Sequence, residues 1–125
     1  MSKQTHKQAA IEFLTMVSSG QVDEAYKRYV GDRFGHHNPY FRGDAESLRV
    51  GMQENATLNP EKRCEVKRAI QEGDTVAVHS RVRQNPKDRG FSVVHIFRFE
   101  GDRIVELWDI GQAEPEESVN ENGMF

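Results

Sequence analysis

Asp109 and His95 are the residues whose types and positions best suit acid–base chemistry. Asp109 follows Trp108 in IVELWDIGQ (104–112), and His95 lies in FSVVHIFRF (91–99); both runs have the apolar composition of strands. A carboxylate that an apolar wall removes from water is a better base toward a carbon acid than an exposed one. A neighbouring imidazole can donate a hydrogen bond to a carbonyl oxygen that becomes an enolate, or carry the proton onward. The residues therefore predict proton transfer next to a carbonyl; the alternative is that they only satisfy each other, or that Asp109 caps a turn.

The relative position of the two residues depends on how their strands pair. If the connecting loop consists of the three residues 100–102, His95 lies opposite Leu107 and Val93 lies opposite Asp109. His95 and Asp109 are then diagonal neighbours on one face of the hairpin. The rest of that face is apolar and predicts a pocket wall, made by Phe91, Val93, Phe97, Phe99, Val105 and Leu107.

The opposite face of the same hairpin is also too apolar to face water over its whole width. It carries Val94, Ile96, Ile104, Trp108 and Ile110. A hairpin with two apolar faces needs two covers, and one set of three short helices supplies only one. We therefore expect a homodimer that buries Val94, Ile96, Trp108 and Ile110 against a symmetric partner.

Two further regions could contribute to the pocket. In the HHNP segment (36–39), adjacent side chains point in different directions, so at most one histidine can line a shared site; we choose His37 or Asn38, with a plain capping loop as the alternative. His79 lies out of phase with the valines of its strand, and the pattern leaves open whether it faces the cavity or solvent. Aromatic residues such as Tyr26 and Phe34 are expected in the core or the pocket wall.

Composition excludes several classes of function. The net charge of −3 gives no excess of basic residues for nucleic acid or an anionic membrane. No HxH or HExxH spacing indicates a metal, and the nucleotide, phosphate, serine-hydrolase and thiol-redox motifs GxGxxG, P-loop, GxSxG and CxxC do not occur. We expect no cofactor and no metal. One cysteine, no apolar leader and no run of about 18 apolar residues predict a cytoplasmic protein.

Three helices are predicted in the first half of the chain. Apolar residues recur at three- and four-residue spacing over 7–17 and over 21–29, and glycines end both stretches at Gly20 and Gly31. Asp44 can cap a third helix, which Asn59-Pro60 ends. Its inward positions are Leu48, Met52 and Ala56.

Four strands are predicted in the second half, where the apolar spacing changes to two. Cys64, Val66 and Ile70 alternate with charge before a turn at Gly73-Asp74, and strands follow over 76–82, 91–99 and 104–110. The prediction is a single α+β domain over 1–125 in which a curved sheet packs on three N-terminal helices. The tail from Ala113 is expected to be irregular, although Met124 and Phe125 could dock on a neighbour.

Several blocks of the sequence are similar to a known pattern. They are HHNP near position 37, EGDTVAVHSRV (72–82), VVHIFRFEGDRIVELWDIGQ (93–112) and the final NGMF. They span nearly the whole chain in the right order, and the chain resembles the SnoaL-like polyketide cyclases of the nuclear-transport-factor-2-like superfamily. The resemblance implies a cone of three helices on a strongly curved mixed sheet, with an internal cavity and dimerisation through the outer sheet face.

The resemblance also implies roles for the two titratable residues. In SnoaL-like cyclases an aspartate of the WD block is the general acid and base of an intramolecular aldol closure, helped by a histidine on the preceding strand; these match Asp109 and His95. Ketosteroid isomerase, of the same superfamily, likewise uses a buried acid to move a proton beside a carbonyl. Many relatives carry Asp at position 95 and His at position 107, so the resemblance does not identify the substrate.

We therefore expect a cofactor-independent cyclase or isomerase that acts on a small, largely apolar carbonyl substrate. The alternative is a non-catalytic homodimer of the same fold that binds a small ligand, since a shared fold does not carry function with it. Asp109 and His95 are the candidate catalytic residues. The candidate substrate contacts are His37, Asn38, His79, Phe34, Tyr26, Phe97 and Leu107.

Overall fold

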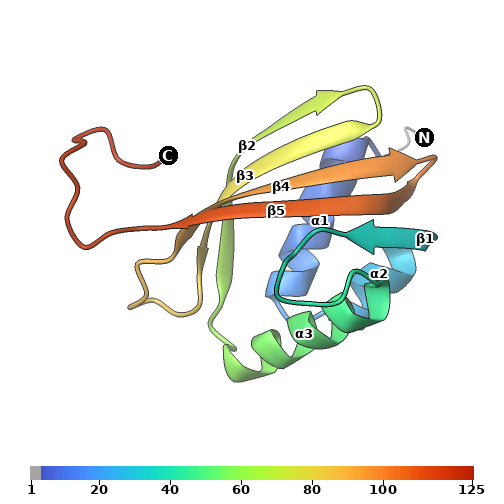
Figure 1. Cartoon of the computed structure of the whole chain (residues 1–125), viewed down its shortest axis with the longest axis horizontal. Helices are drawn as coiled ribbons and strands as arrows, with labels where there is room; N and C mark the ends of the chain where they lie inside the picture. The colour runs from blue at the N-terminus through green and yellow to red at the C-terminus, as the bar shows by residue number, and fades with distance from the viewer. Residues whose placement is uncertain (1–3) are drawn as a thin grey trace.

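The structure is a computed structural model that describes residues 4–125, and it contains three helices and a five-stranded mixed sheet (Figure 1). The elements follow one another as α1 (His6–Ser18), α2 (Val22–Tyr29), β1 (Val30–His36), α3 (Ala45–Leu58), β2 (Arg63–Glu72), β3 (Thr75–Arg83), β4 (Phe91–Glu100) and β5 (Arg103–Ala113). The strand order is β1-β5-β4-β3-β2, and only the β1–β5 pair is parallel. The predicted α+β class is confirmed.

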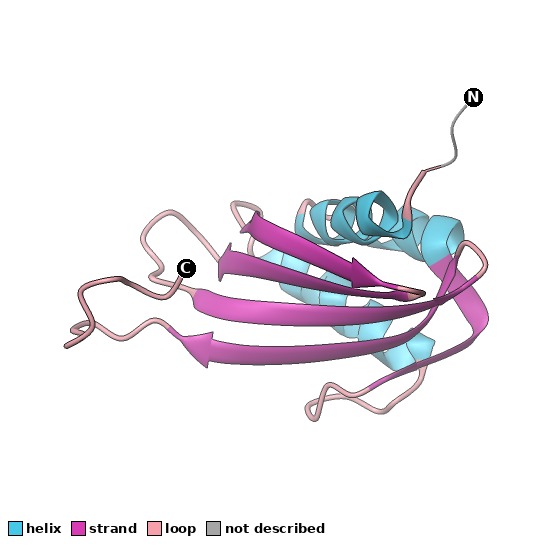
Figure 2. Ribbon diagram, turned by 90° about the horizontal axis from the view of Figure 1, so that it is seen from above, coloured by secondary structure: helices cyan, strands magenta, loops and turns pink. Residues whose placement is uncertain are grey.

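The helices begin and end where local signals place them. Thr5 and Gln8 form a capping box at the start of α1, and Gly20 with a φ of 91° follows its end. The Asp44 carboxylate accepts a hydrogen bond of 2.9 Å from the backbone N–H of Ser47 and caps α3. All three helices lie on one side of the sheet, as Figure 2 shows.

Strand β1 was not predicted. The sequence pattern indicated that Gly31 would close the second helix, but α2 ends at Tyr29 and the chain continues directly into a strand. Only Phe34 and His36 of this strand are buried, and its glycines interrupt the alternation of apolar residues. An edge strand that pairs in parallel with β5, far along the chain, leaves little local signal.

The predicted register of the β4–β5 hairpin was wrong. Glu100 pairs with Arg103, so the loop has two residues, and the ladder then shifts because Phe99 pairs with Ile104 while Arg98 pairs with Glu106. Val105 is the extra residue of this β-bulge, and the following pairs bring His95 directly opposite Asp109. The bulge also turns Ile104 into the core, where it is fully buried, instead of onto the outer face.

A second bulge, between Val66 and Arg68, changes the phase of β2. Beyond it, Ala69 rather than Ile70 packs against the core, and 65% of the Ile70 side chain is exposed. The predicted alignment of Ile70 with Cys64 and Val66 was therefore wrong. A regular period of two cannot be carried across an inserted residue.

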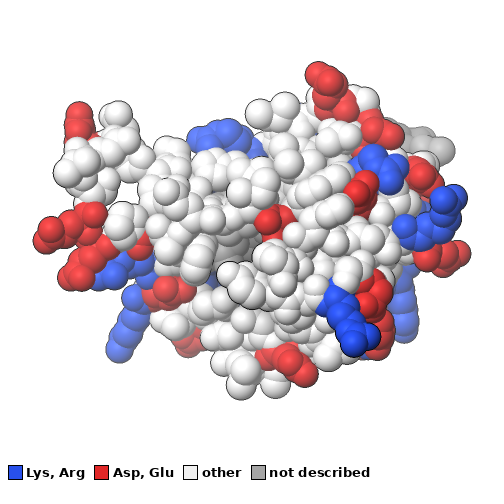
Figure 3. Space-filling view, viewed as in Figure 1, with Lys and Arg blue, Asp and Glu red and all other residues white. Residues whose placement is uncertain are grey.

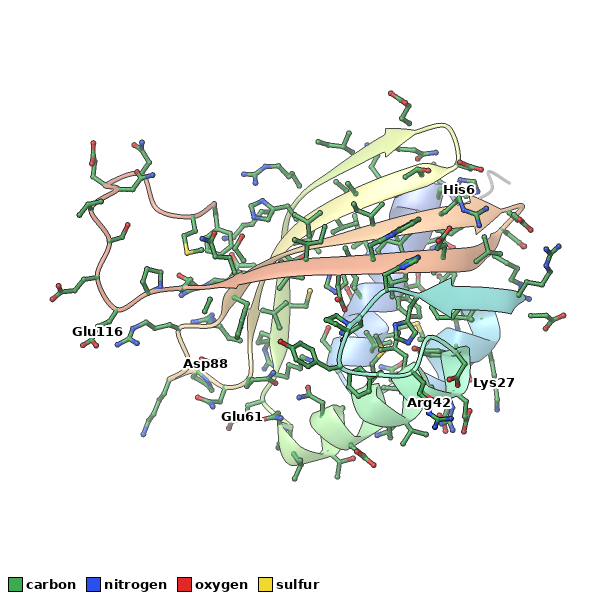
Figure 4. The ribbon with its side chains drawn as sticks, in the orientation of Figure 1. His6, Lys27, Arg42, Glu61, Asp88 and Glu116 are labelled. Carbon is green, nitrogen blue, oxygen red and sulfur yellow. The ribbon has the colours of Figure 1, made fainter. Side chains whose placement is uncertain are left out.

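The core lies between the inner face of the sheet and the helices. Phe13 of α1 contacts Phe97 of β4 edge to face, with 5.9 Å between ring centroids, and both side chains are fully buried. Side chains fill the space between the layers, as the sticks in Figure 4 show. No helix within residues 4–125 is long and apolar enough to cross a membrane.

The chain after β5 has no regular structure, as predicted, and it turns back toward the outer face of the sheet (Figure 1). The Phe125 ring stacks on His79 with 5.5 Å between centroids. Lys67 and Arg81 lie within cation–π distance of the same ring. The end of the described chain thus contacts its own β2 and β3.

Candidate functional site

A pocket of about 430 Å³ lies between the inner face of the sheet, α1, α3 and the loop after β1. That size is within the range of small-molecule sites. Its walls are mostly apolar, with a few polar side chains that converge on the interior. The lining residues are Leu14, Val17, Ser18, Asn38, Pro39, Tyr40, Met52, Lys62, Cys64, Val82, Phe91, Val93, His95, Asp109 and Gly111.

Asp109 is half-buried in this wall and is held by one side chain. The Asn38 Nδ2 group donates a hydrogen bond of 2.9 Å to Asp109 Oδ2. The Asn38 Oδ1 atom accepts a hydrogen bond of 2.9 Å from the backbone N–H of Tyr40, which fixes the amide so that its NH₂ group faces the carboxylate. The carboxylate therefore keeps acceptor capacity for another donor.

His36 holds the loop that carries Asn38 through two hydrogen bonds. Its Nδ1 atom accepts a hydrogen bond of 3.1 Å from the backbone N–H of Asn38, and its Nε2 atom therefore donates to the carbonyl oxygen of Arg42, 2.5 Å away. His36 is buried, so these bonds fix the course of the loop that carries Asn38. The sequence analysis did not assign this role to His36.

His95 lies directly opposite Asp109 on β4 and borders the same pocket. Its Nδ1 atom is buried and has no hydrogen-bond partner among residues 4–125. Burial lowers the pKa of His95 below the usual histidine range, and the negative charge of Asp109 opposes this effect only in part. The imidazole is therefore neutral at neutral pH.

The structure brings Asn38 to the pocket but places the other two polar candidates on the outer face of the sheet. His37 is exposed, stacks on Trp108 with 4.9 Å between centroids, and lies 2.7 Å from a carboxylate oxygen of Glu106. His79 Nε2 lies 2.8 Å from the hydroxyl of Ser92 on the same outer face. Neither histidine borders the pocket, which removes the geometric basis for their role as substrate contacts.

The four apolar candidates belong to the core that supports the pocket. Their exposed fractions are 7% for Tyr26, 9% for Phe34, 0% for Phe97 and 1% for Leu107, and none of them lines the pocket. The hydroxyl of Tyr26 contacts the sulfur of Met52 at 3.4 Å, and Met52 does line it. These residues therefore hold the wall in place rather than present a surface to a ligand.

Lys62 and Cys64 are pocket residues that the sequence analysis did not identify. Both lie where β2 begins, after the turn that follows α3. Burial raises the pKa of the Cys64 thiol, which keeps it protonated. The Cys64 signal was present in the strand alternation, but nothing in the local sequence distinguishes Lys62 from an exposed lysine.

The outer face of the sheet carries the four residues that we expect at a dimer interface. Val94, Ile96 and Trp108 are half-buried, and 62% of Ile110 is exposed. Figure 3, viewed as Figure 1, shows most charged side chains toward the ends and edges of the molecule and only a few acidic atoms in an otherwise uncharged middle. Within residues 4–125, no group of three or more His, Cys, Asp or Glu side chains is placed to hold a metal ion.

Comparisons with known proteins agree with this fold. A nuclear-transport-factor-2-like protein of unknown function from Cytophaga hutchinsonii superposes with a TM-score of 0.72 at 19% identity, over 90% of this chain and 95% of that one. A provisionally named polyketide cyclase from Acidithiobacillus ferrooxidans superposes with a TM-score of 0.67 at 17% identity, over 90% of this chain and 92% of that one.

A third structure, a SnoaL-like protein of unknown function from Burkholderia thailandensis, superposes with a TM-score of 0.69 at 20% identity, over 90% of this chain and 100% of that one. No curated protein matches the sequence. The sequence signature of the SnoaL-like domain matches residues 10–107, which include most of α1, the other two helices, β1 to β4 and the start of β5. The chain therefore belongs to the SnoaL-like domain family.

Proposed function

We propose that this protein is a cofactor-independent cyclase or isomerase that moves a proton next to a carbonyl group of a small, largely apolar substrate. The observation that carries the proposal is the pairing of Asp109 directly opposite His95 in the wall of a pocket of about 430 Å³. Asp109 is the general base and His95 is the donor to the developing oxyanion.

The neutral state of His95 suits this role. Because its Nδ1 atom is buried without a partner, a proton on that nitrogen would be an unsatisfied buried donor. The tautomer with the proton on Nε2 avoids this cost and leaves an N–H group to bind a carbonyl oxygen. A neutral imidazole with this tautomer donates a hydrogen bond without giving up its proton.

In the proposed reaction, an Asp109 oxygen takes the proton from the carbon next to the carbonyl. The electron pair of the broken C–H bond forms the enolate, whose oxygen accepts the hydrogen bond from His95. In a cyclase, the enolate carbon then attacks a second carbonyl of the same substrate, and the new alkoxide takes the proton back from Asp109. In an isomerase, the proton returns to a different carbon of the enolate system.

The non-catalytic alternative would be favoured by a narrow pocket, or by an Asp109 carboxylate that backbone donors saturate. The described hydrogen bonds instead give Asp109 one donor, the Asn38 side chain. The pocket volume of about 430 Å³ is also large enough for a small molecule. The free acceptor capacity of Asp109 supports the enzymatic function over pure binding, whereas the pocket size is compatible with both.

We also propose that the protein acts as a homodimer through Val94, Ile96, Trp108 and Ile110. The support is the uncovered apolar surface on the face of the sheet opposite the helices. None of these four residues is among those that line the pocket, so the proposed interface does not include the pocket wall.

The test is enzyme-dependent deuterium exchange at the carbon next to the carbonyl of neutral aryl ketones such as propiophenone, followed in heavy water by proton NMR. Asp109→Asn keeps the size of the side chain and removes the base, so the exchange rate should fall by at least about a hundredfold. Asp74→Asn, at an exposed turn, is the matched control and should exchange at the wild-type rate. An Asp109→Asn variant that retains full exchange would remove Asp109 from the mechanism.

A further inference from the structure

Lys62 is a charged residue of the pocket that the proposed reaction does not use. It lies just before β2, in the turn that carries Glu61, which Figure 4 labels close to the end of α3. Its Nζ atom donates a hydrogen bond of 2.7 Å to the side-chain oxygen of Asn55 on α3. The side chain is half-buried and borders the same pocket as Asp109 and His95.

The Lys62 ammonium has no acidic partner. Among residues 4–125, no carboxylate oxygen lies within 4.0 Å of Nζ, whereas Lys67 on β2 pairs with Glu65. An ammonium has three protons to donate, and the contact with Asn55 uses only one of them. Burial lowers the pKa of Lys62, as expected for a cation that is removed from water without an opposite charge.

Lys62 and Asp109 place opposite charges on different sides of the pocket. Lys62 adjoins β2, at one edge of the sheet, and Asp109 lies on β5, with β3 and β4 between them. Apolar side chains from the intervening strands, Val82 and Val93, line the space. The pocket thus has the Lys62 cation on the β2 side and the Asp109 carboxylate on the β5 side, with apolar side chains from the strands between them.

We propose that Lys62 binds the carboxylate of the ligand, and that the substrates are keto acids whose carbonyl lies at His95 and Asp109. This assignment rests on the proposed function for the position of the carbonyl. An incoming carboxylate supplies the missing counter-charge of Lys62, and the negative charge of Asp109 repels it from the other end, so one orientation is favoured. A single ammonium suits a carboxylate better than a phosphate dianion, which calls for more donors.

The test uses three keto acids of increasing length, benzoylpropionate, benzoylbutyrate and benzoylvalerate, each compared with its neutral methyl ester. Their phenyl ketones match an apolar pocket, and the series covers different spans between ketone and carboxylate. Dissociation constants for the full chain are measured by calorimetry or by NMR titration. At least one acid should bind about tenfold or more tightly than its ester, as expected for one charge-assisted hydrogen bond.

Two variants separate the charge from other effects. Lys62→Met keeps the length of the side chain and should remove the preference for the acid while leaving ester binding unchanged; Lys62→Gln serves the same purpose if the methionine variant does not fold. Lys67→Met, which removes a lysine of β2 that does not line the pocket, is the matched control and should keep the preference.

Three results would overturn the inference. They are equal affinity of all acids and their esters, a Lys62 variant that weakens both equally, and no binding of any acid at millimolar concentration. Covalent capture of a ketone on Lys62 after borohydride treatment, detected by mass spectrometry, would also overturn it, because the amine would then act as a nucleophile. The proposed function fails separately: binding can depend on Lys62 while deuterium exchange in the bound acid shows no dependence on Asp109.

Discussion

The protonation state of His95 can be tested through the acid sensitivity of folding. Burial holds the pKa of the folded-state imidazole below that of an unfolded histidine, which is about 6.5. As pH falls below that value, His95 binds a proton in the unfolded chain but stays unprotonated in the folded chain. The contribution is therefore fully present above about pH 6.5 and is lost on acidification toward the folded-state pKa.

The expected magnitude follows from linkage. If the folded protein leaves His95 unprotonated, one proton taken up only by the unfolded chain lowers the free energy of unfolding by about 1.4 kcal/mol between about pH 7.5 and about pH 5.5. His95→Gln removes the titrating ring and keeps a polar side chain of similar length. The variant should lose less stability over that interval than the wild type, by up to this amount.

The assay is urea unfolding of both proteins at the two pH values, with the same buffer ions and ionic strength. The charges of Asp109 and Lys62 lie near His95 and are present in both proteins, so the difference between the two pH dependences reports the effect of removing the His95 ring. His79→Gln is the matched control on the outer face. Burial and Arg68 lower the pKa of His79 as well, but its ring is less enclosed, so a smaller part of the acid sensitivity should disappear.

A direct measurement completes the test. In an NMR titration of the ring protons, His95 should remain neutral as pH falls below about 6.5. If His95 titrates at or above that value, or if His95→Gln leaves the acid sensitivity unchanged, the imidazole is not a neutral donor at neutral pH. The proposed role in binding an oxyanion would then need a charged imidazolium instead.

Three further predictions concern the loop, the outer face and the core. Asn38→Ala removes the only side-chain donor described for Asp109 and should slow deuterium exchange by about tenfold, with little change in ketone affinity. Ile110→Asp places a charge on the outer face and should convert a dimer into a monomer by light scattering; a wild-type monomer would contradict the interface. Phe97→Ala leaves a cavity beside Phe13 and should lower the free energy of unfolding by about 3–5 kcal/mol in urea, whereas a loss below 1 kcal/mol, roughly that of a surface change, would contradict full burial.

Local patterns were sufficient for the helices and for the four antiparallel strands. The cap Asp44 and the helix stop Gly20 act within one helical turn, and apolar spacing changes clearly from about 3.6 to 2 after Pro60. These signals depend only on neighbours in the chain. They allowed prediction of which segments form, but not of how strands pair at a distance.

The shared face of His95 and Asp109 was predicted although the register was not. The loop is one residue shorter than expected, and the bulge at Val105 adds one residue back, so the two errors cancel in side-chain direction. The actual arrangement is closer than the predicted one, because the residues are directly opposite rather than diagonal. Two adjacent apolar residues, Ile104 and Val105, were the available sign of a bulge.

The remaining polar pocket residues come from separate parts of the chain, and the sequence predicted them only in part: Asn38 was a candidate together with His37, and Lys62 was not identified. Lys62 reaches the pocket through a turn after α3, and Asn38 reaches it through the loop after an edge strand that has weak alternation. His37 and Asn38 are adjacent and equally polar, yet the parallel pairing of β1 with β5 turns one outward and the other inward. Which of the two side chains faces the pocket is therefore determined by contacts between residues that are distant in the sequence.

The strand pairing of the hairpin can accommodate the deletion of Val105, the extra residue of the bulge. A chain that lacked this residue could pair Glu100 with Arg103 and His95 with Asp109 in an unbroken ladder, so the acid would still face inward. Such a deletion would remove the bend of β5 and the Val105 side chain that lies beside Gly31 of β1. The two residues are close enough that a Cβ atom added to Gly31 would lie 3.4 Å from Val105 Cγ1. Deletion of Val105 should therefore leave Asp109 facing the pocket and weaken the packing of β1, the edge strand that leads to Asn38.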